Sequence, residues 1–250
     1  MNLTLIQELH RQYDSNPSET IKQLRTIDFE NINQNPSSAL REQYLANTIQ
    51  NKLGNHFNNA LNLQQNVDVV LLFIDICSFS TRFSHLNNTQ LSNILDQYYN
   101  IVMPTIYKYN GEIDKIIGDG IIALFGSPFI NSSGKTLFDI AENCAKDLID
   151  KTKGTLYKSK IALHNGVVMY YRNKSVRYPE YTIVGKPITE LHRLESISTD
   201  ETINFYHSSQ YGTHTGNKYH GLKWRLTNLQ SIHPPLKGVN YTYTRAIEKI

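Results

Sequence analysis

The sequence predicts an α+β fold in which a sheet rich in antiparallel strands carries helices on one face. Residues 1–65 have helical periodicity, and runs of β-branched and apolar residues begin at Val67. From Val67 the expected elements follow the order β-α-β-β-α-β with later additions, which indicates an α+β sheet. We therefore divide the 250 residues into a helical N-terminal extension, 1–65, and a second domain, 66–250.

The composition excludes several classes of protein. Hydrophobic residues make up 40% of the chain, which supports a core, and the formal charge of +3 is too mild for a dedicated nucleic-acid binder. No stretch approaches the about 18 apolar residues of a membrane span, and the start lacks the pattern of a secretion signal. Cys77 and Cys144 fit neither a disulfide framework nor a zinc site. We therefore expect a cytoplasmic protein.

Two helix starts are expected in the extension. Asn16 is expected to be an N-cap, with Pro17 as the first helical residue and Glu19 as the third. Pro36 is expected to open a longer helix whose apolar residues recur mostly at intervals of three or four. These residues are Leu40, Tyr44, Leu45, Ile49, Leu53, Phe57 and Leu61. The stripe must be covered by the second domain or by a second copy of the chain.

A central strand and a long helix are expected to open the second domain. Val67–Ile74 is apolar apart from Asp68 and rich in β-branched residues, which predicts a strand buried on both faces. Gly111 is expected to stop the following helix, and Pro104 to kink it or to mark its last turns. The apolar face of that helix contains Leu91, Ile94, Leu95, Tyr98, Val102 and Ile106.

A hairpin and alternating elements follow. Glu112–Ile117 and Ile121–Phe125 are expected to be strands joined by the Gly118-Asp119-Gly120 turn. Lys160–Tyr171 is expected to be a strand that is bulged or broken near Asn165-Gly166. The other expected elements are a helix at 135–152, a strand at 181–184, a helix at 188–197, and strands at 202–206, 222–227 and 239–246.

Two aspartates stand where a metal site could form. Asp75 ends the central apolar run, and Asp119 occupies the hairpin turn. Carboxylates at a strand end and in an adjacent hairpin can hold divalent metal between them, and such oxygen ligands suit Mg²⁺ or Mn²⁺ bound together with phosphates. A two-metal site of this kind activates an attacking oxygen and stabilises a leaving one.

Three segments resemble the motifs of class III nucleotidyl cyclases, in the same order. They are Phe73-Ile74-Asp75-Ile76-Cys77-Ser78-Phe79-Ser80, Asp114-Lys115-Ile116-Ile117-Gly118-Asp119-Gly120, and Tyr181-Thr182-Ile183-Val184-Gly185 followed by Arg193-Leu194-Glu195. The resemblance implies a ferredoxin-like domain that works as a dimer. It also implies a reaction in which the 3′-hydroxyl of a nucleoside triphosphate attacks its own α-phosphorus, so that pyrophosphate leaves and a 3′,5′-cyclic nucleotide remains.

The resemblance implies a set of metal and phosphate contacts. Asp75, Asp119 and the Ile76 carbonyl would hold two divalent cations, Mg²⁺ or Mn²⁺. Ile76, Phe79 and Ser80 would also bind the substrate, since backbone N–H groups in the turn can cradle phosphate oxygens. These assignments place phosphate and metal at the end of the central strand.

The remaining substrate contacts implied by the resemblance lie in the second and third motifs. Lys115 and Thr182 would select the base, and Thr189 stands where an asparagine normally orients the ribose. Arg193 would stabilise charge on the transferred phosphate with its planar guanidinium. In the family, Lys115, Thr182 and Arg193 come from the partner subunit. The active form would be a homodimer with composite sites, and a monomer would be inactive.

Several positions depart from the family pattern. Ser78 stands where glycine is usual, and Thr189 replaces the ribose-binding asparagine. Val239 falls where a phosphate-binding lysine is often found. Lys237 could substitute for that lysine, although a structural role is favoured. The segment 186–190 is also unlike the usual run. These departures concern the handling of sugar and phosphate.

The base that is cyclised stays open. Lys115 and Thr182 favour ATP, as in many bacterial adenylate cyclases. A short helical leader without a sensor domain, together with the unusual segment 186–190, resembles instead the pyrimidine cyclases of bacterial Pycsar antiphage systems. Those enzymes make cyclic UMP or cyclic CMP for a separate effector protein, and we favour this interpretation.

Two other functions compete with an active cyclase of this kind. A catalytically inactive cyclase-like binding module is disfavoured because Asp75, Asp119 and Arg193 are all present. A diguanylate cyclase would carry a Gly-Gly-[Asp/Glu]-Glu-Phe turn, which is absent. His207, His214 and His220 lie near one another in the sequence, without the spacing of a metal site.

Overall fold

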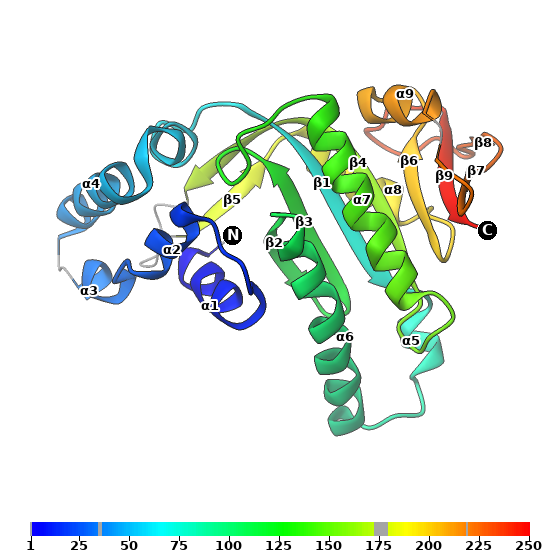
Figure 1. The fold of residues 1–250 in the computed structure, drawn as a ribbon, viewed down its shortest axis with the longest axis horizontal. Helices are drawn as coiled ribbons and strands as arrows, with labels where there is room; N and C mark the ends of the chain where they lie inside the picture. Colours follow the sequence, from blue (N-terminus) through cyan, green and yellow to red (C-terminus); the bar gives the residue numbers. More distant parts are fainter. Residues whose placement is uncertain (1, 35–36, 173–179, 219) are drawn as a thin grey trace.

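The extension is helical, as predicted. A computed structural model describes residues 2–34, 37–172, 180–218 and 220–250 (Figure 1). The extension contains α1 (Leu3–Tyr13), α2 (Glu19–Arg25), α3 (Phe29–Gln34), α4 (Ser38–Phe57) and the π-helical turn η1 (Asn58–Asn62). In the described ranges, the helices are too short or too polar to cross a lipid bilayer.

The start of α2 was predicted two residues too early. α2 begins at Glu19 rather than at Pro17, because the Ser18 hydroxyl caps it by accepting a hydrogen bond from the Ile21 N–H at 3.2 Å. Asn16 and Pro17 therefore precede the helix. The serine thus satisfies the Ile21 N–H, one of the free backbone donors of the first helical turn.

The apolar stripe of α4 is buried from Leu45 onward. Leu40 and Tyr44 are 50% and 64% exposed, so the prediction of one continuous buried face is wrong for its first two members. The other members share a core with the sheet: Leu45, Ile49, Leu53, Phe57 and Leu61. The second domain therefore covers this stripe. Ser37 caps α4, and Pro36, expected to open the helix, lies outside the described residues.

Nine strands form the sheet in the part of the chain that the structure describes. Their order is β2-β3-β1-β4-β6-β9-β7, with β5 paired to β4 and β8 paired to β9. All pairings are antiparallel except that of β4 with β6. The strands are β1 (Val67–Ile76), β2 (Glu112–Ile117), β3 (Gly120–Gly126), β4 (Ser159–Arg172), β5 (Tyr181–Val184), β6 (Thr202–Tyr206), β7 (Trp224–Leu226), β8 (Gln230–Ser231) and β9 (Tyr243–Lys249). The predicted α+β fold is confirmed.

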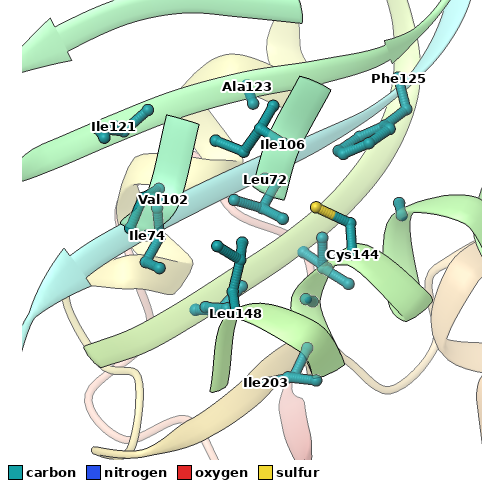
Figure 2. Packing of buried hydrophobic residues seen from close by; sticks show 14 of the residues in the cluster. Leu72, Ile74, Val102, Ile106, Ile121, Ala123, Phe125, Cys144, Leu148 and Ile203 are labelled. Atoms are coloured by element: carbon teal, nitrogen blue, oxygen red, sulfur yellow. The ribbon is translucent and has the colours of Figure 1, made fainter. Parts of the chain in front are cut away.

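The central strand β1 is buried on both faces, as predicted. Leu72 and Ile74 face a core formed with α6 (Asn88–Lys108) and α7 (Lys135–Thr152), and Figure 2 shows this packing. The alternate residues Leu71 and Phe73 face a second core on the other side of the sheet. Burial on both sides fixes the register of β1, because a slip by one residue would exchange the two faces.

Helices cover both faces of the sheet, so the prediction of helices on one face is wrong. The second core contains residues of the extension and of α8 (Lys186–Glu195), whose Leu191 and Leu194 are fully buried. The predicted β-α-β-β-α-β order contains only two helices, α6 and α7. It therefore did not predict the layer that the extension and α8 form on the other face. Asp75 lies on the same face of the sheet as this second core.

Two glycines that the sequence marked as breaks allow close packing instead. Asn110 takes the left-handed φ of 57° after α6, whereas a Cβ on Gly111 would lie 2.7 Å from the Phe125 ring. β4 runs unbroken through Gly166, where a Cβ would lie 2.4 Å from Pro187 of α8. The predicted bulge in β4 is therefore wrong, and the glycine lets α8 approach the strand.

Two further element boundaries shift by a few residues, whereas Pro104 lies where it was expected. Pro104 lies inside α6, four residues before its end, as expected for a proline in the last turns. α8 begins at Lys186, earlier than predicted, with a proline in its first turn. β9 begins only at Tyr243, because Leu236 and Val239 pack against the second core as loop residues.

A buried ionic network joins the extension to the sheet. His10 of α1 lies 2.8 Å from Asp14 and 2.8 Å from Glu112, the first residue of β2. Burial alone would lower the pKa of His10, but the carboxylates of Glu112 and Asp14 raise it overall. The network holds α1 against the start of β2, since an unpaired charge would be costly at this buried position.

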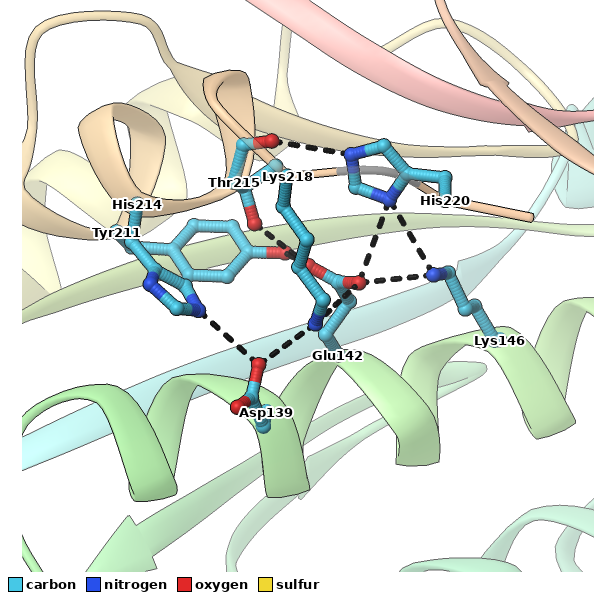
Figure 3. A network of polar contacts seen from close by, with 8 residues as sticks. All are labelled: Asp139, Glu142, Lys146, Tyr211, His214, Thr215, Lys218 and His220. Atoms are coloured by element: carbon cyan, nitrogen blue, oxygen red, sulfur yellow. Dashed lines mark hydrogen bonds and ion pairs between the residues drawn. The ribbon is translucent and has the colours of Figure 1, made fainter.

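A second buried network ties α9 (Gln210–Gly216) to α7, as Figure 3 shows. The Glu142 carboxylate, fully buried, accepts hydrogen bonds from Thr215 at 2.5 Å, Lys146 at 2.8 Å and Lys218 at 3.2 Å. Burial alone would raise its pKa, but hydrogen bonds from His220, Lys146 and Thr215 hold that pKa far below its usual value. His214 and His220 thus belong to a structural network, in which His214 lies 3.0 Å from the nearby Asp139.

We predict that Glu142→Gln destabilises the protein by about 3 kcal/mol at pH 7, because it leaves buried cations without their carboxylate. Glu142 has a depressed pKa in the folded protein, so its contribution is present above the ordinary value of 4.5 and is lost as the pH falls through the folded pKa. Urea unfolding at pH 7 and at pH 3.5 to 4 tests both points. The difference in the free energy of unfolding between variant and wild type should be smaller at the lower pH.

The control for this prediction is Asp150→Asn. Asp150 is paired with Lys249 at 2.7 Å and is 41% exposed, so its loss should cost less than about 1 kcal/mol. Equal effects of the two substitutions would show that the buried network contributes no more than a surface ion pair.

Candidate active site

The fold brings the two predicted aspartates together. Asp75 is the penultimate residue of β1 and lies on the same face as Phe73, two residues earlier. Asp119 lies in the turn between β2 and β3, and β3 pairs with β1. The two carboxyl groups lie within hydrogen-bonding reach of each other. Strand pairing, rather than proximity in the sequence, creates this contact.

The electrostatics of the pair suit a divalent cation. Burial raises the pKa of the Asp75 carboxyl to about 8, and contact with Asp119 and the charge of Glu195 act in the same direction, while Lys160 lowers it. Two adjacent carboxylates repel each other unless a proton or a cation lies between them. Oxygen donors of this type suit Mg²⁺ or Mn²⁺, so the residues present fit the predicted metals.

Protein side chains alone would supply only part of the coordination shell. Within the described ranges, no cluster of three or more His, Cys, Asp or Glu side chains could hold a metal ion. Ile76, the last residue of β1, follows Asp75 directly and is buried. The Ile76 carbonyl, water and phosphate oxygens are the donors that would complete the shell.

Lys160 and Glu195 border the acid pair, and the sequence did not single them out for this place. Lys160 is the direct cross-strand partner of Asp75, with its Nζ 3.9 Å from Asp75 Oδ2 and 2.8 Å from Glu195 Oε1. Glu195 lies in the third motif, which predicts no role for it. Finding Lys160 required the β1–β4 register, which the sequence does not reveal.

The turn after Asp75 explains one departure from the family pattern. Ser78 has φ 54°, in the left-handed region, and precedes the single-turn helix α5 (Phe79–Arg82). Glycine adopts this conformation without steric cost, which accounts for its usual presence there. Ser80 is exposed, whereas the Phe79 ring packs edge-on against Phe83 at 5.1 Å.

Cys77 is an inert residue in this turn. Burial raises the pKa of the Cys77 thiol to about 12, and the side chain is fully buried. A thiol of this kind stays protonated at neutral pH and is a poor nucleophile.

Lys115 and Thr182 are brought together, although they lie far apart in the sequence. Lys115 Nζ lies 3.5 Å from the Thr182 hydroxyl and 3.5 Å from the buried Asp114 carboxylate. Lys115 belongs to β2 and Thr182 to β5. The fold therefore brings the two predicted base-selecting residues into contact.

Thr189 and Arg193 lie four residues apart on α8 and are both exposed. An α-helix turns about 100° per residue, so Arg193 points away from Glu195, which faces Lys160. Arg193 has no ion-pair partner among the residues that the structure describes. Its side chain therefore leaves α8 on the side opposite to Glu195, which borders the acid pair.

Lys237 is exposed in the loop before β9, and Val239 packs against the second core. The loop is closed by a hydrogen bond from the Val239 N–H to the Leu236 carbonyl at 3.1 Å. This packing accounts for the apolar residue at 239. Whether Lys237 contacts phosphate stays a prediction.

We predict that Ser78→Gly stabilises the protein by about 1 kcal/mol, because it removes the cost of a left-handed non-glycine residue. The matched control is Ser80→Gly in the adjacent helical turn, which should destabilise by about 0.5–1 kcal/mol. Thermal and urea unfolding measure both. A lower stability for Ser78→Gly would contradict the backbone argument.

We also predict that Asp75→Asn and Asp119→Asn each weaken Mn²⁺ binding by about tenfold or more. Lys160→Met should strengthen binding, because it removes a positive charge 3.9 Å from Asp75. Electron paramagnetic resonance of free Mn²⁺ measures the affinities directly. Asp68→Asn, an exposed carboxylate at the other end of β1, is the control and should leave them unchanged.

Sequence comparisons identify relatives of most of the chain. A family model described as the adenylate and guanylate cyclase catalytic domain matches residues 61–230. An uncharacterised protein of Mycobacterium tuberculosis is 23% identical over 170 residues, which cover 66% of this chain and 30% of that protein. The photoactivated adenylate cyclase subunit alpha of Euglena gracilis is 25% identical over 150 residues, 57% of this chain and 14% of that protein. The chain thus spans less than a third of either relative.

Solved structures show the same fold. The catalytic core of a rhodopsin-guanylyl cyclase with converted specificity, in complex with ATPαS, matches with a TM-score of 0.61 and 21% identity, covering 74% of this chain and 98% of that chain. The adenylyl cyclase CyaB from P. aeruginosa matches with a TM-score of 0.56 and 20% identity, covering 73% and 94%. At these identities the comparison concerns the fold.

Proposed function

Because the chain belongs to the adenylate and guanylate cyclase catalytic domain family, whose enzymes are lyases, we propose that it converts a nucleoside triphosphate into a 3′,5′-cyclic nucleotide and pyrophosphate. The contact between the Asp75 and Asp119 carboxyl groups is the observation that carries this proposal. Such a pair has no evident structural purpose, since mutual repulsion and burial both make it costly. It is accounted for by a cation that arrives with the substrate.

The residues divide into a metal side and a substrate side. Asp75, Asp119 and the Ile76 carbonyl would hold two Mg²⁺ or Mn²⁺ ions, which make the ribose 3′-hydroxyl more acidic and neutralise the polyphosphate when bound. Phe79 and Ser80 border the phosphates in the turn. These groups orient the triphosphate for attack along the line of the leaving pyrophosphate.

The substrate side is proposed to come from a second copy of the chain. Arg193 and Thr189 are exposed on α8, and Arg193 leaves the helix on the side opposite to Glu195, which borders the acid pair. In a homodimer this surface would face the partner's acid pair, so that Arg193 could stabilise charge on the transferred phosphate. Each active site would then need both subunits.

We propose a pyrimidine triphosphate as the substrate, with a separate effector protein responding to cyclic UMP or cyclic CMP in antiphage defence. The unusual 186–190 segment supports this choice. ATP is the second candidate, because the Lys115–Thr182 pair offers a cationic donor beside a hydroxyl. Cytosine and adenine both present a ring-nitrogen acceptor beside an amino group, so the pair is compatible with either base.

Incubation of the purified protein with each of the four triphosphates and Mn²⁺ tests the proposal, with products identified by mass spectrometry. Cyclic CMP or cyclic UMP as the main product supports the pyrimidine choice. Cyclic AMP as the main product removes the pyrimidine choice and the antiphage assignment that depends on it. Absence of pyrophosphate release with every triphosphate would indicate an inactive module.

We predict that Asp75→Ala and Arg193→Ala each abolish activity as homodimers, while a mixture of the two recovers part of it. With random exchange, half of the dimers are heterodimers that contain one intact site, so about a quarter of wild-type activity should return. Pyrophosphate release measures the recovery, and mixed mass labels confirm subunit exchange. No recovery despite exchange would argue against sites shared between subunits.

A further inference from the structure

The exposed face of α8 contains a histidine beside the two predicted substrate residues. Thr189, His192 and Arg193 are all exposed. Their spacing of three and four residues places them on one side of the helix. The opposite side contains Leu191 and Leu194, which are fully buried. His192 is therefore presented on the same surface as Thr189 and Arg193, and the proposed function gives it no role.

Strand register and the packing of α8 together place His192 near Lys115. Lys115 pairs with Ile122 on β3, and Ile122 pairs with Phe73 on β1. Directly paired residues share a face of the sheet, so Lys115 and Phe73 lie in one row on the face that also contains Asp75. The His192 ring stands edge-on to Phe73, with ring centroids 5.3 Å apart and planes at 83°.

We propose that His192 contacts the nucleobase held by Lys115 and Thr182 and determines, with them, which base is accepted. This inference rests on the proposed cyclase function and deepens it. Lys115 on β2, Thr182 on β5 and His192 on α8 then supply the base-recognising groups: an ammonium, a hydroxyl and an imidazole. They stand beside Arg193, on the proposed substrate side of the composite site.

The chemistry of the imidazole suits base recognition. A neutral imidazole has one N–H donor and one nitrogen acceptor, so it adds an acceptor that Lys115 lacks. Burial and then the positive charge of Lys115 lower the pKa of His192, which favours the neutral ring at pH 7. The Phe73 contact limits the motion of the ring, so in the proposed arrangement the imidazole would take up space beside Lys115 and Thr182 that the second ring of a purine would need. A single-ring base is therefore favoured.

The test compares kcat/KM for all four triphosphates in wild type, His192→Ala and His192→Phe. Removing the ring in His192→Ala should shift the purine-to-pyrimidine ratio of kcat/KM toward purines by on the order of tenfold. His192→Phe keeps the ring volume and should keep the ratio, while lowering kcat/KM for the preferred base through loss of a hydrogen bond. Displacement of a bound fluorescent nucleotide measures the affinity for each triphosphate, and these affinities should follow the same order as the kcat/KM values.

The control is His233→Ala, an exposed histidine in the loop between β8 and β9, which should leave all four values unchanged. Circular dichroism and thermal unfolding establish that each variant is folded. If His192→Ala fails to fold, the purine-to-pyrimidine ratio of kcat/KM is compared between His192→Phe and His192→Gln. The glutamine variant should shift this ratio toward purines, and the phenylalanine variant should not. An unchanged ratio in an active enzyme would overturn this inference alone, whereas an inactive wild type would overturn the proposed function.

Discussion

The repulsion between the Asp75 and Asp119 carboxyl groups is the constraint around which the site is arranged. Two acids in contact, one of them largely buried, cost free energy in any protein. The fold tolerates them because β1 is locked by cores on both faces and the β2–β3 hairpin is held by its pairing to β1. The packing of apolar residues along the sheet thus offsets the free-energy cost of holding Asp75 and Asp119 in contact.

The rest of the chain supports this rigid strand. The extension contributes apolar residues to the second core and is held to β2 by the His10–Glu112 pair. α8 reaches the sheet closely because Gly166 leaves room for Pro187. That approach places Glu195 beside Lys160 on one side of α8 and leaves Arg193 on the exposed side. Scaffold and site are therefore built from the same contacts.

Local sequence signals predicted the elements that depend on local physics. The strand at 181–184, the helix at 135–152 and the strand pair around Asp119 have the expected positions because apolar periodicity and turn chemistry determine them. The N-cap of α2 was misplaced because Asn16 and Ser18 are both good caps. The supposed break at Gly166 was misread because a close contact and a bulge favour the same residue.

Features that depend on pairing could not be predicted in this way. Lys160 is recognised only when strand register places it beside Asp75, and His192 only when the packing of α8 places it against Phe73, in the same row as Lys115. The Glu142 network likewise joins residues from two distant segments. The motif residues themselves were identified by resemblance, and the structure shows which of them meet within one chain.

Lys160 has one further consequence. Its ammonium lies near the acid pair and is itself held by Glu195, so part of the negative charge is compensated by the protein itself. The chain can therefore fold before any ion is bound. If the acid pair holds divalent cations as proposed, the supply of free magnesium or manganese would govern how fast the protein works, while its folding would not depend on that supply.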